Sequence, residues 1–180
     1  MMITPGEFKA RWGNGLVRNT EAALAHVRIP EASKRFLVEA GLPAEAELGL
    51  QFARYEDELP TLLGAFPEDD LPADYARFRP IGVDYATIIC LDERDGGHLY
   101  GVDIEGHGLP TRFVNSSVPQ LAEFLLAVRV VPEEGPPMGW MEAEADAYTE
   151  ELAQKFRQVD PEAMSDEKSY WRSYLRGTLI

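Results

Sequence analysis

The spacing of apolar residues near the start of the chain predicts two helices. Phe8 and Trp12 lie four residues apart and therefore share one helix face. The preceding Thr4-Pro5-Gly6-Glu7 is typical of a helix start, with a capping side chain first and a carboxylate three residues later. A second helix is predicted from Pro30 to Ala40, because a glycine follows it at the position where helices usually end. Residues 19–28 fit either a helix or a loop.

The pattern changes to alternation after residue 47. Leu48, Leu50 and Phe52 alternate with small or polar residues, which predicts a strand. Apolar runs then follow one another closely, with turn residues such as those of 92–97 between them. We expect a short helical turn at 73–78 and strands at 79–83, 86–91, 99–104 and 111–115. Successive strands with short connections favour an antiparallel meander over crossover units.

Helical spacing returns after the last strand. Ser117-Val118-Pro119-Gln120 fits a capping box, and the helix after it carries an apolar stripe of Val118, Leu121, Leu125 and Val128. Two more helices are predicted at about 140–158 and 166–177, after a linker at 133–139. We expect the last helix to dock on the core through Tyr170, Trp171, Tyr174 and Leu175.

These elements predict an α+β fold, in which a central antiparallel β-sheet is flanked by N-terminal and C-terminal helices. We expect a single domain over residues 1–180, with a core at about 30–130 on which a C-terminal helical segment at about 140–180 packs. A hydrophobic content of 45% in 180 residues excludes a disordered tail protein. No apolar run reaches the roughly 18 residues that a membrane helix needs. The start lacks a signal peptide pattern, and the single Cys90 cannot form an internal disulfide, so we expect a cytoplasmic protein.

Acidic residues exceed basic ones by 31 to 17, which gives a net charge of −14. A field of this sign repels nucleic acids and anionic membranes and favours basic partners. The charge is uneven: residues 43–74 and 131–168 each carry −8, whereas residues 1–42 carry +2. Such blocks are either a partner-binding surface or a solvated face that only keeps the protein soluble.

Catalytic and metal-binding motifs are absent from the sequence. It contains no phosphate-binding loop, nucleophile elbow or paired cysteines. His98 and His107 bracket Asp103 and Glu105, but strand alternation places His98 on the opposite face from the two acids. Cys90 lies in an apolar strand and is interpreted as a small core residue. We therefore predict no enzyme activity, no metal and no cofactor.

Several short motifs follow one another in a fixed order along the chain. The central ones are Phe78 to Gly82, Ile88 to Asp92, Gly97 to Asp103, Phe113 to Ser117 and Leu121 to Leu125. Weaker ones precede and follow them: Arg35-Phe36-Leu37, Gly41-Leu42-Pro43, Trp171 and Gly177. Taken in order, these motifs resemble the SUKH superfamily of immunity proteins, and most closely its fourth SUKH-type family. The resemblance implies an α+β protein that protects a bacterial cell by binding a toxin, without chemistry of its own.

The resemblance and the charge together predict an immunity protein, or antitoxin, that neutralises a cognate polymorphic toxin through an acidic surface. The toxin would be basic, as nucleases and nucleic-acid deaminases are at their substrate clefts. Candidate partner-binding residues are Asp69, Asp70, Asp74, Asp84, Tyr85, Asp103 and Glu105. Two alternatives are a SUKH-type protein-binding module with a regulatory or scaffolding role, and a small enzyme that uses the acidic loops. The sequence leaves the oligomeric state open.

Overall fold

The computed structural model describes residues 2–85, 87–106, 110–129 and 142–177. Its centre is a five-stranded antiparallel sheet in the order β3-β4-β5-β6-β7, so each strand pairs with its neighbours in the sequence. The strands are β3 (Gln51–Phe52), β4 (Phe78–Val83), β5 (Ile88–Asp92), β6 (Leu99–Val102) and β7 (Thr111–Asn115). The predicted α+β fold with an antiparallel meander is confirmed.

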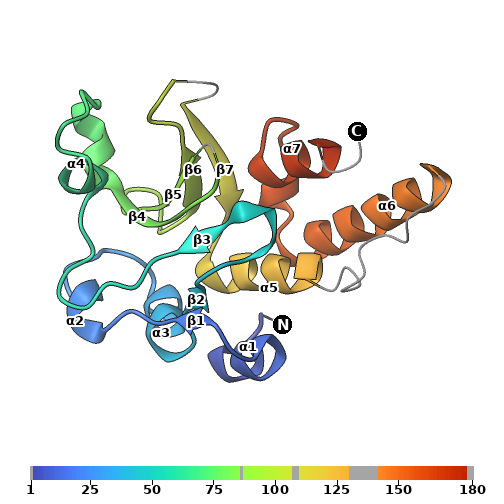
Figure 1. The fold of residues 1–180 in the computed structure, drawn as a ribbon, viewed down its shortest axis with the longest axis horizontal. Coiled ribbons are helices and arrows are strands. Elements are labelled where there is room, and N and C mark those ends of the chain that lie inside the picture. Colours follow the sequence, from blue (N-terminus) through green and yellow to red (C-terminus); the bar gives the residue numbers. More distant parts are fainter. Residues whose placement is uncertain (1, 86, 107–109, 130–141, 178–180) are drawn as a thin grey trace.

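Helices come both before and after this sheet in the sequence (Figure 1). Before β3 come α1 (Pro5–Trp12), α2 (Glu21–Leu24), α3 (Glu31–Glu39) and a small sheet of β1 (Leu16–Val17) and β2 (Leu42–Pro43). After β7 come α5 (Val118–Arg129), α6 (Glu142–Val159) and α7 (Tyr170–Gly177). The short α4 (Leu62–Ala65) and the 3₁₀ helix η2 (Ala73–Arg77) separate β3 from β4, while η1 (Glu47–Gly49) precedes β3 and η3 (Glu162–Met164) precedes α7.

The main hydrophobic core lies between the helices and one face of the sheet. Strand residues that alternate toward this face include Ile89, Leu91 and Leu99, all fully buried. The N-terminal helices and α5 contribute the other side, as do the aromatic residues of the C-terminal helices. In this core the rings of Phe124 (α5) and Phe156 (α6) stack with their centroids 3.9 Å apart.

A smaller core lies on the other face of the sheet, which we call the second face. Its buried members are Leu62, Phe78, Cys90 and Val102. Half-buried residues of α4, η2 and the chain between them pack on it: Phe66, Leu71 and Tyr75. This packing holds the segment from α4 to η2 against the sheet.

A buried polar cluster joins the C-terminal helices to β7. The carboxylate of Asp160 accepts hydrogen bonds from Asn115 Nδ2 at 3.1 Å, Ser116 N at 2.7 Å and Ser116 Oγ at 2.8 Å. Asn115 Oδ1 in turn accepts a bond from the indole Nε1 of Trp171 at 2.9 Å. Asn115 and Trp171 are fully buried, and Trp171 belongs to the main hydrophobic core.

Most predicted elements match the structure, and the exceptions have local causes. The strand predicted from Leu48 begins only at Gln51, because Gly49 adopts φ +67° within η1, and β3 is therefore two residues long. The strand predicted at 99–104 ends at Val102, because Asp103 begins a turn. The linker predicted at 133–139 lies outside the described residues. The small β1–β2 sheet and α4 were not predicted.

Candidate partner-binding surface

The segment from α4 to the end of η2 presents four exposed carboxylates, those of Glu68, Asp69, Asp70 and Asp74. Its apolar residues fix it to the second face of the sheet. Thr61 caps α4, because its Oγ1 accepts the Gly64 N–H at 3.1 Å. The segment therefore places its carboxylates in solvent while its apolar residues hold the backbone.

The turn between β4 and β5 holds two further predicted residues, Asp84 and Tyr85. Asp84 is half-buried, and its Oδ1 accepts bonds from Thr87 N at 2.7 Å and Thr87 Oγ1 at 3.1 Å. Burial raises the pKa of the Tyr170 hydroxyl in α7, and the charge of Asp84 and a hydrogen bond to it raise it further. Asp84 therefore shapes this turn and contacts α7.

Tyr85 is the most exposed large hydrophobic residue described, at 90% of its surface. Its ring lies directly over Gly49, where an added Cβ would come within 2.4 Å of the ring carbons. An aromatic side chain that packs on the backbone with one face and is otherwise open to solvent is typical of an interface anchor.

Asp103 and Glu105 differ sharply in exposure. Asp103 is 9% exposed, and its Oδ1 accepts the backbone N–H groups of Glu105 at 3.0 Å and Gly106 at 2.9 Å. It therefore stabilises the turn after β6, whereas Glu105 is exposed. Because Ile88 pairs with both Val83 and Val102, this turn lies at the same end of the sheet as the β4–β5 turn.

Two of the predicted residues, Asp74 and Asp103, act on the hydroxyl of Tyr75. Burial raises the pKa of its hydroxyl, and the carboxylates of Asp74 and Asp103 raise it further, so both carboxylates lie near this phenol. Of the seven predicted residues, five are exposed, Asp84 is half-buried and Asp103 is buried. The exposed five are Asp69, Asp70, Asp74, Tyr85 and Glu105.

An aromatic row across the second face was missed by the sequence analysis. Ring centroids lie 5.4 Å apart for Tyr75–Phe78, 6.2 Å for Phe78–Tyr100 and 5.5 Å for Tyr100–Phe113. Beside the row, Asp95 Oδ2 accepts a 2.5 Å bond from the Tyr100 hydroxyl, and this bond lowers the pKa of the Asp95 carboxyl. Alternation along β6 and β7 was the available signal, because Tyr100 and Phe113 are paired across the strands.

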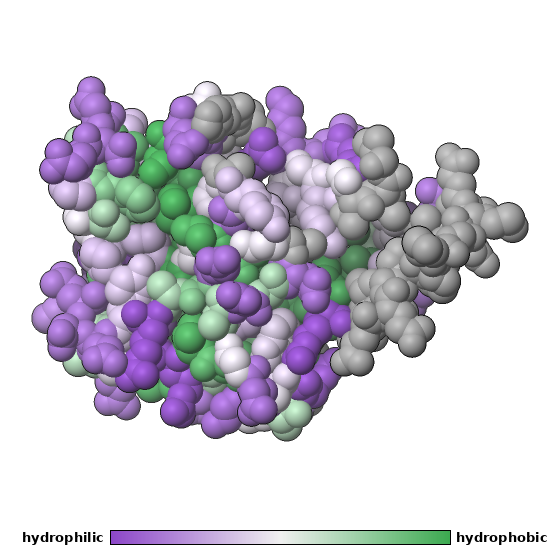
Figure 2. Space-filling view, viewed as in Figure 1, coloured by the Kyte–Doolittle hydropathy of each residue, from purple (hydrophilic) through white to green (hydrophobic). Residues whose placement is uncertain are grey.

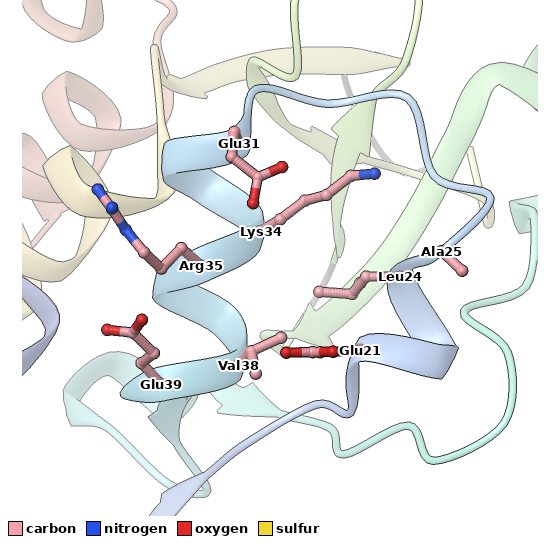
Figure 3. Close-up of a pocket in the computed structure, with 8 residues that line it drawn as sticks. All are labelled: Glu21, Leu24, Ala25, Glu31, Lys34, Arg35, Val38 and Glu39. Carbon is pink, nitrogen blue, oxygen red and sulfur yellow. The ribbon is translucent and has the colours of Figure 1, made fainter.

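Several grooves open on the described surface, among them one beside α3 and one beside α4. The first, about 360 Å³, lies between α2 and α3. Figure 3 shows Lys34 and Val38 extending from α3 toward Leu24 and Glu21 of α2. Its lining mixes carboxylates with Lys34 and Arg35, so it does not concentrate one sign of charge.

The second groove, about 270 Å³, lies between α4 and the β3–β4 edge of the sheet; we call it the β3–β4 groove. All the residues that line it are uncharged: Ala44, Gln51, Phe52, Ala53, Tyr55, Ala65, Phe66, Pro80, Gly82, Val83 and Ile88. Figure 2 shows hydrophobic residues gathered over the strands beside α4.

The described residues carry neither a cluster of metal ligands nor an exposed thiol. Within the described ranges, no three His, Cys, Asp or Glu residues are placed to hold a metal ion, and His107 lies outside those ranges. Cys90 is fully buried, and burial raises the pKa of its thiol, which confirms its interpretation as a core residue. No helix in the part of the chain that the structure describes has the length and apolar character to cross a membrane.

Comparison with known proteins decides the family. The family model of the SUKH-4 immunity proteins matches residues 3–176, which is nearly the whole chain. The chain belongs to the SUKH-4 immunity protein family. Membership in the SUKH-4 family implies immunity against a toxin, and hence a cognate toxin as partner. The comparisons with curated proteins and with solved structures found no match.

The structure explains why the motifs that resemble SUKH proteins include residues so far apart. The Phe113 to Ser117 motif contains Asn115 and Ser116, which bind Asp160. The C-terminal Trp171 donates to the same Asn115. These SUKH-4 residues hold the C-terminal helices on the sheet and are separate from the exposed acidic residues.

Proposed function

We propose that this SUKH-4 protein neutralises a basic toxin by binding it, without any chemical step, through the acidic surface of the α4–η2 segment. The observation that supports this most directly is that Asp69, Asp70 and Asp74 are exposed on a backbone that apolar residues hold against the sheet. We include in this surface the exposed Tyr85 and Glu105, from turns at one end of the sheet whose shape Asp84 and Asp103 stabilise. A nuclease or nucleic-acid deaminase fits as the toxin class, because a cleft that binds phosphates carries the complementary charge.

Charge and aromatic residues would have different roles in this complex. A net charge of −14 attracts a basic protein over distances up to about the Debye length. Exposed carboxylates therefore mainly raise the association rate. An anchor such as Tyr85 becomes fully buried in the interface and mainly lowers the dissociation rate. The buried Asp103 acts through the shape of its turn.

The test uses the cognate toxin domain, sought first among the products of the neighbouring genes. Asp69→Asn combined with Asp70→Asn is expected to lower the association rate about tenfold at low salt, and less at high salt. The matched control, Glu151→Gln with Glu162→Gln, removes the same charge from exposed positions of α6 and η3 and is expected to have a much smaller effect. Both rates are read by surface plasmon resonance across a salt series.

Three outcomes contradict the proposal. The toxin could fail to bind the wild-type protein, or it could bind with a rate independent of salt. Equal losses in the acidic-segment variant and the control would mean that net charge alone matters.

A further inference from the structure

The β3–β4 groove is an uncharged hollow beside one of the two acidic blocks of the chain. Most of its lining comes from residues 44 to 66, and residues 43–74 carry nine acids against one base. Phe52 and Pro80 are buried in the groove, Phe66 and Tyr55 are half-buried, and Val83 is 38% exposed. The groove therefore offers apolar surface to solvent where the neighbouring side chains are charged.

Exposed acids follow two of the lining residues closely along the chain. Glu56 comes directly after Tyr55, and Glu68 two residues after Phe66. The single base of this region, Arg54, pairs with Glu56 at 2.8 Å. We call the exposed Glu68 and Asp69, which follow the lining residue Phe66 in the chain, the acidic border of the groove.

We infer that the β3–β4 groove receives an apolar side chain that projects from a basic surface of the partner, and this rests on the proposed function, which makes the partner a toxin. Interfaces combine an apolar centre with a polar surround, and a few residues at the centre carry most of the affinity. The groove has the character of such a centre, and its border is complementary to Lys and Arg. Charge complementarity thus selects a partner segment in which an apolar side chain is flanked by basic ones.

The groove itself can be tested without the toxin. Octylammonium joins an apolar chain to a positive charge, and octyl sulfate joins the same chain to a negative one. At millimolar concentration, octylammonium is expected to shift the methyl NMR signals of Val83 and Ile88, and octyl sulfate is expected to leave them unchanged. Equal shifts with both probes, or no shift with either, would overturn the inference.

Two variants fill the groove. Ala53 and Ala65 are exposed and line it, so Ala53→Trp and Ala65→Trp each place an indole where the partner side chain would lie. The control is Ala10→Trp, at an exposed position of α1 remote from the lining. The two groove variants are expected to abolish the octylammonium shifts, and the control to preserve them.

With the toxin domain, each groove variant is expected to weaken binding about 30-fold or more, mainly through faster dissociation. The control is expected to bind as wild type. If wild-type protein binds the toxin and all three variants bind equally well, the groove is not the anchor although the proposed function holds. If wild-type protein does not bind the toxin, the proposed function fails.

Discussion

Gly41 is the residue whose backbone leaves least freedom for substitution. It follows α3 with φ +75°, a left-handed conformation that side chains with a Cβ rarely adopt. A Cβ at this position would lie 1.9 Å from the carbonyl oxygen of Val17, which belongs to the neighbouring β1. Gly41 therefore both ends the helix and allows the β1–β2 sheet to approach it.

Replacing Gly41 with alanine is expected to lower the free energy of unfolding by at least about 2 kcal/mol, because left-handed strain adds to a clash with backbone. Gly6→Ala is the matched control. Gly6 lies in α1 with open space around its α-carbon, so alanine there is expected to raise stability by up to about 1 kcal/mol. Urea unfolding measures both. A Gly41→Ala protein as stable as wild type would contradict the clash.

At the scale of elements, the attachment of α6 and α7 depends on Asp160. Asp160 is 1% exposed, and its carboxylate accepts hydrogen bonds from the Asn115 side chain, the Ser116 backbone N–H and the Ser116 hydroxyl at the end of β7. Removing it would leave buried donors without a partner, and that costs more than the bonds themselves contribute.

Asp160→Ala is expected to lower the free energy of unfolding by about 3 kcal/mol. The control Glu162→Ala removes an exposed carboxylate two residues away and is expected to change stability by less than about 0.5 kcal/mol. Trp171 is buried beside this cluster, so its fluorescence during urea unfolding reports the transition. Similar stabilities for the two variants would show that the cluster is not needed to hold the C-terminal helices.

Elements with local signals were predictable from the sequence. The capping box of α1 is present as expected, with Glu7 N donating to Thr4 Oγ1 and Thr4 N to Glu7 Oε2. Ser117 likewise accepts the Gln120 N–H at the start of α5. In contrast, β1 and β2 are two residues each and form only because the chain returns beside itself after α3. A pair of residues has no period to detect, so tertiary contact alone defines these strands.

The candidate site was predictable in position more than in role. The acidic block of residues 43–74 indicated where exposed carboxylates would gather. The sequence could not separate Asp103, which binds its own turn, from Glu105, which points to solvent. It also gave no indication of the β3–β4 groove, because the lining comes from residues up to 44 positions apart, from Ala44 to Ile88.

At the scale of the whole molecule, many tyrosine hydroxyls are partly removed from water. Burial is the leading cause that raises the pKa of Tyr55, Tyr75, Tyr100, Tyr148 and Tyr170 above the ordinary value of 10.0. The folded chain therefore holds these protons more tightly than the unfolded chain does.

This difference predicts alkaline destabilisation. The contribution of the tyrosines is fully present below about pH 10, where both states are protonated, and is lost as the pH rises above that value and the unfolded chain ionises first. Urea midpoints are expected to fall steadily above about pH 10. In a pH titration, the tyrosinate absorbance of the folded chain should rise at higher pH than that of the chain unfolded in urea. Coincident titration curves for the folded and unfolded chains would contradict the burial of these hydroxyls.

The sheet order has a consequence for the chain during synthesis. Each strand pairs with the one synthesised just before it, so β3 to β7 can form their sheet in order as they leave the ribosome. The indole of Trp171, which donates to Asn115, is synthesised 56 residues later. A nascent or prematurely terminated chain therefore keeps the Phe124 side of its core uncovered, and a cell's proteases can remove it before it competes with finished molecules.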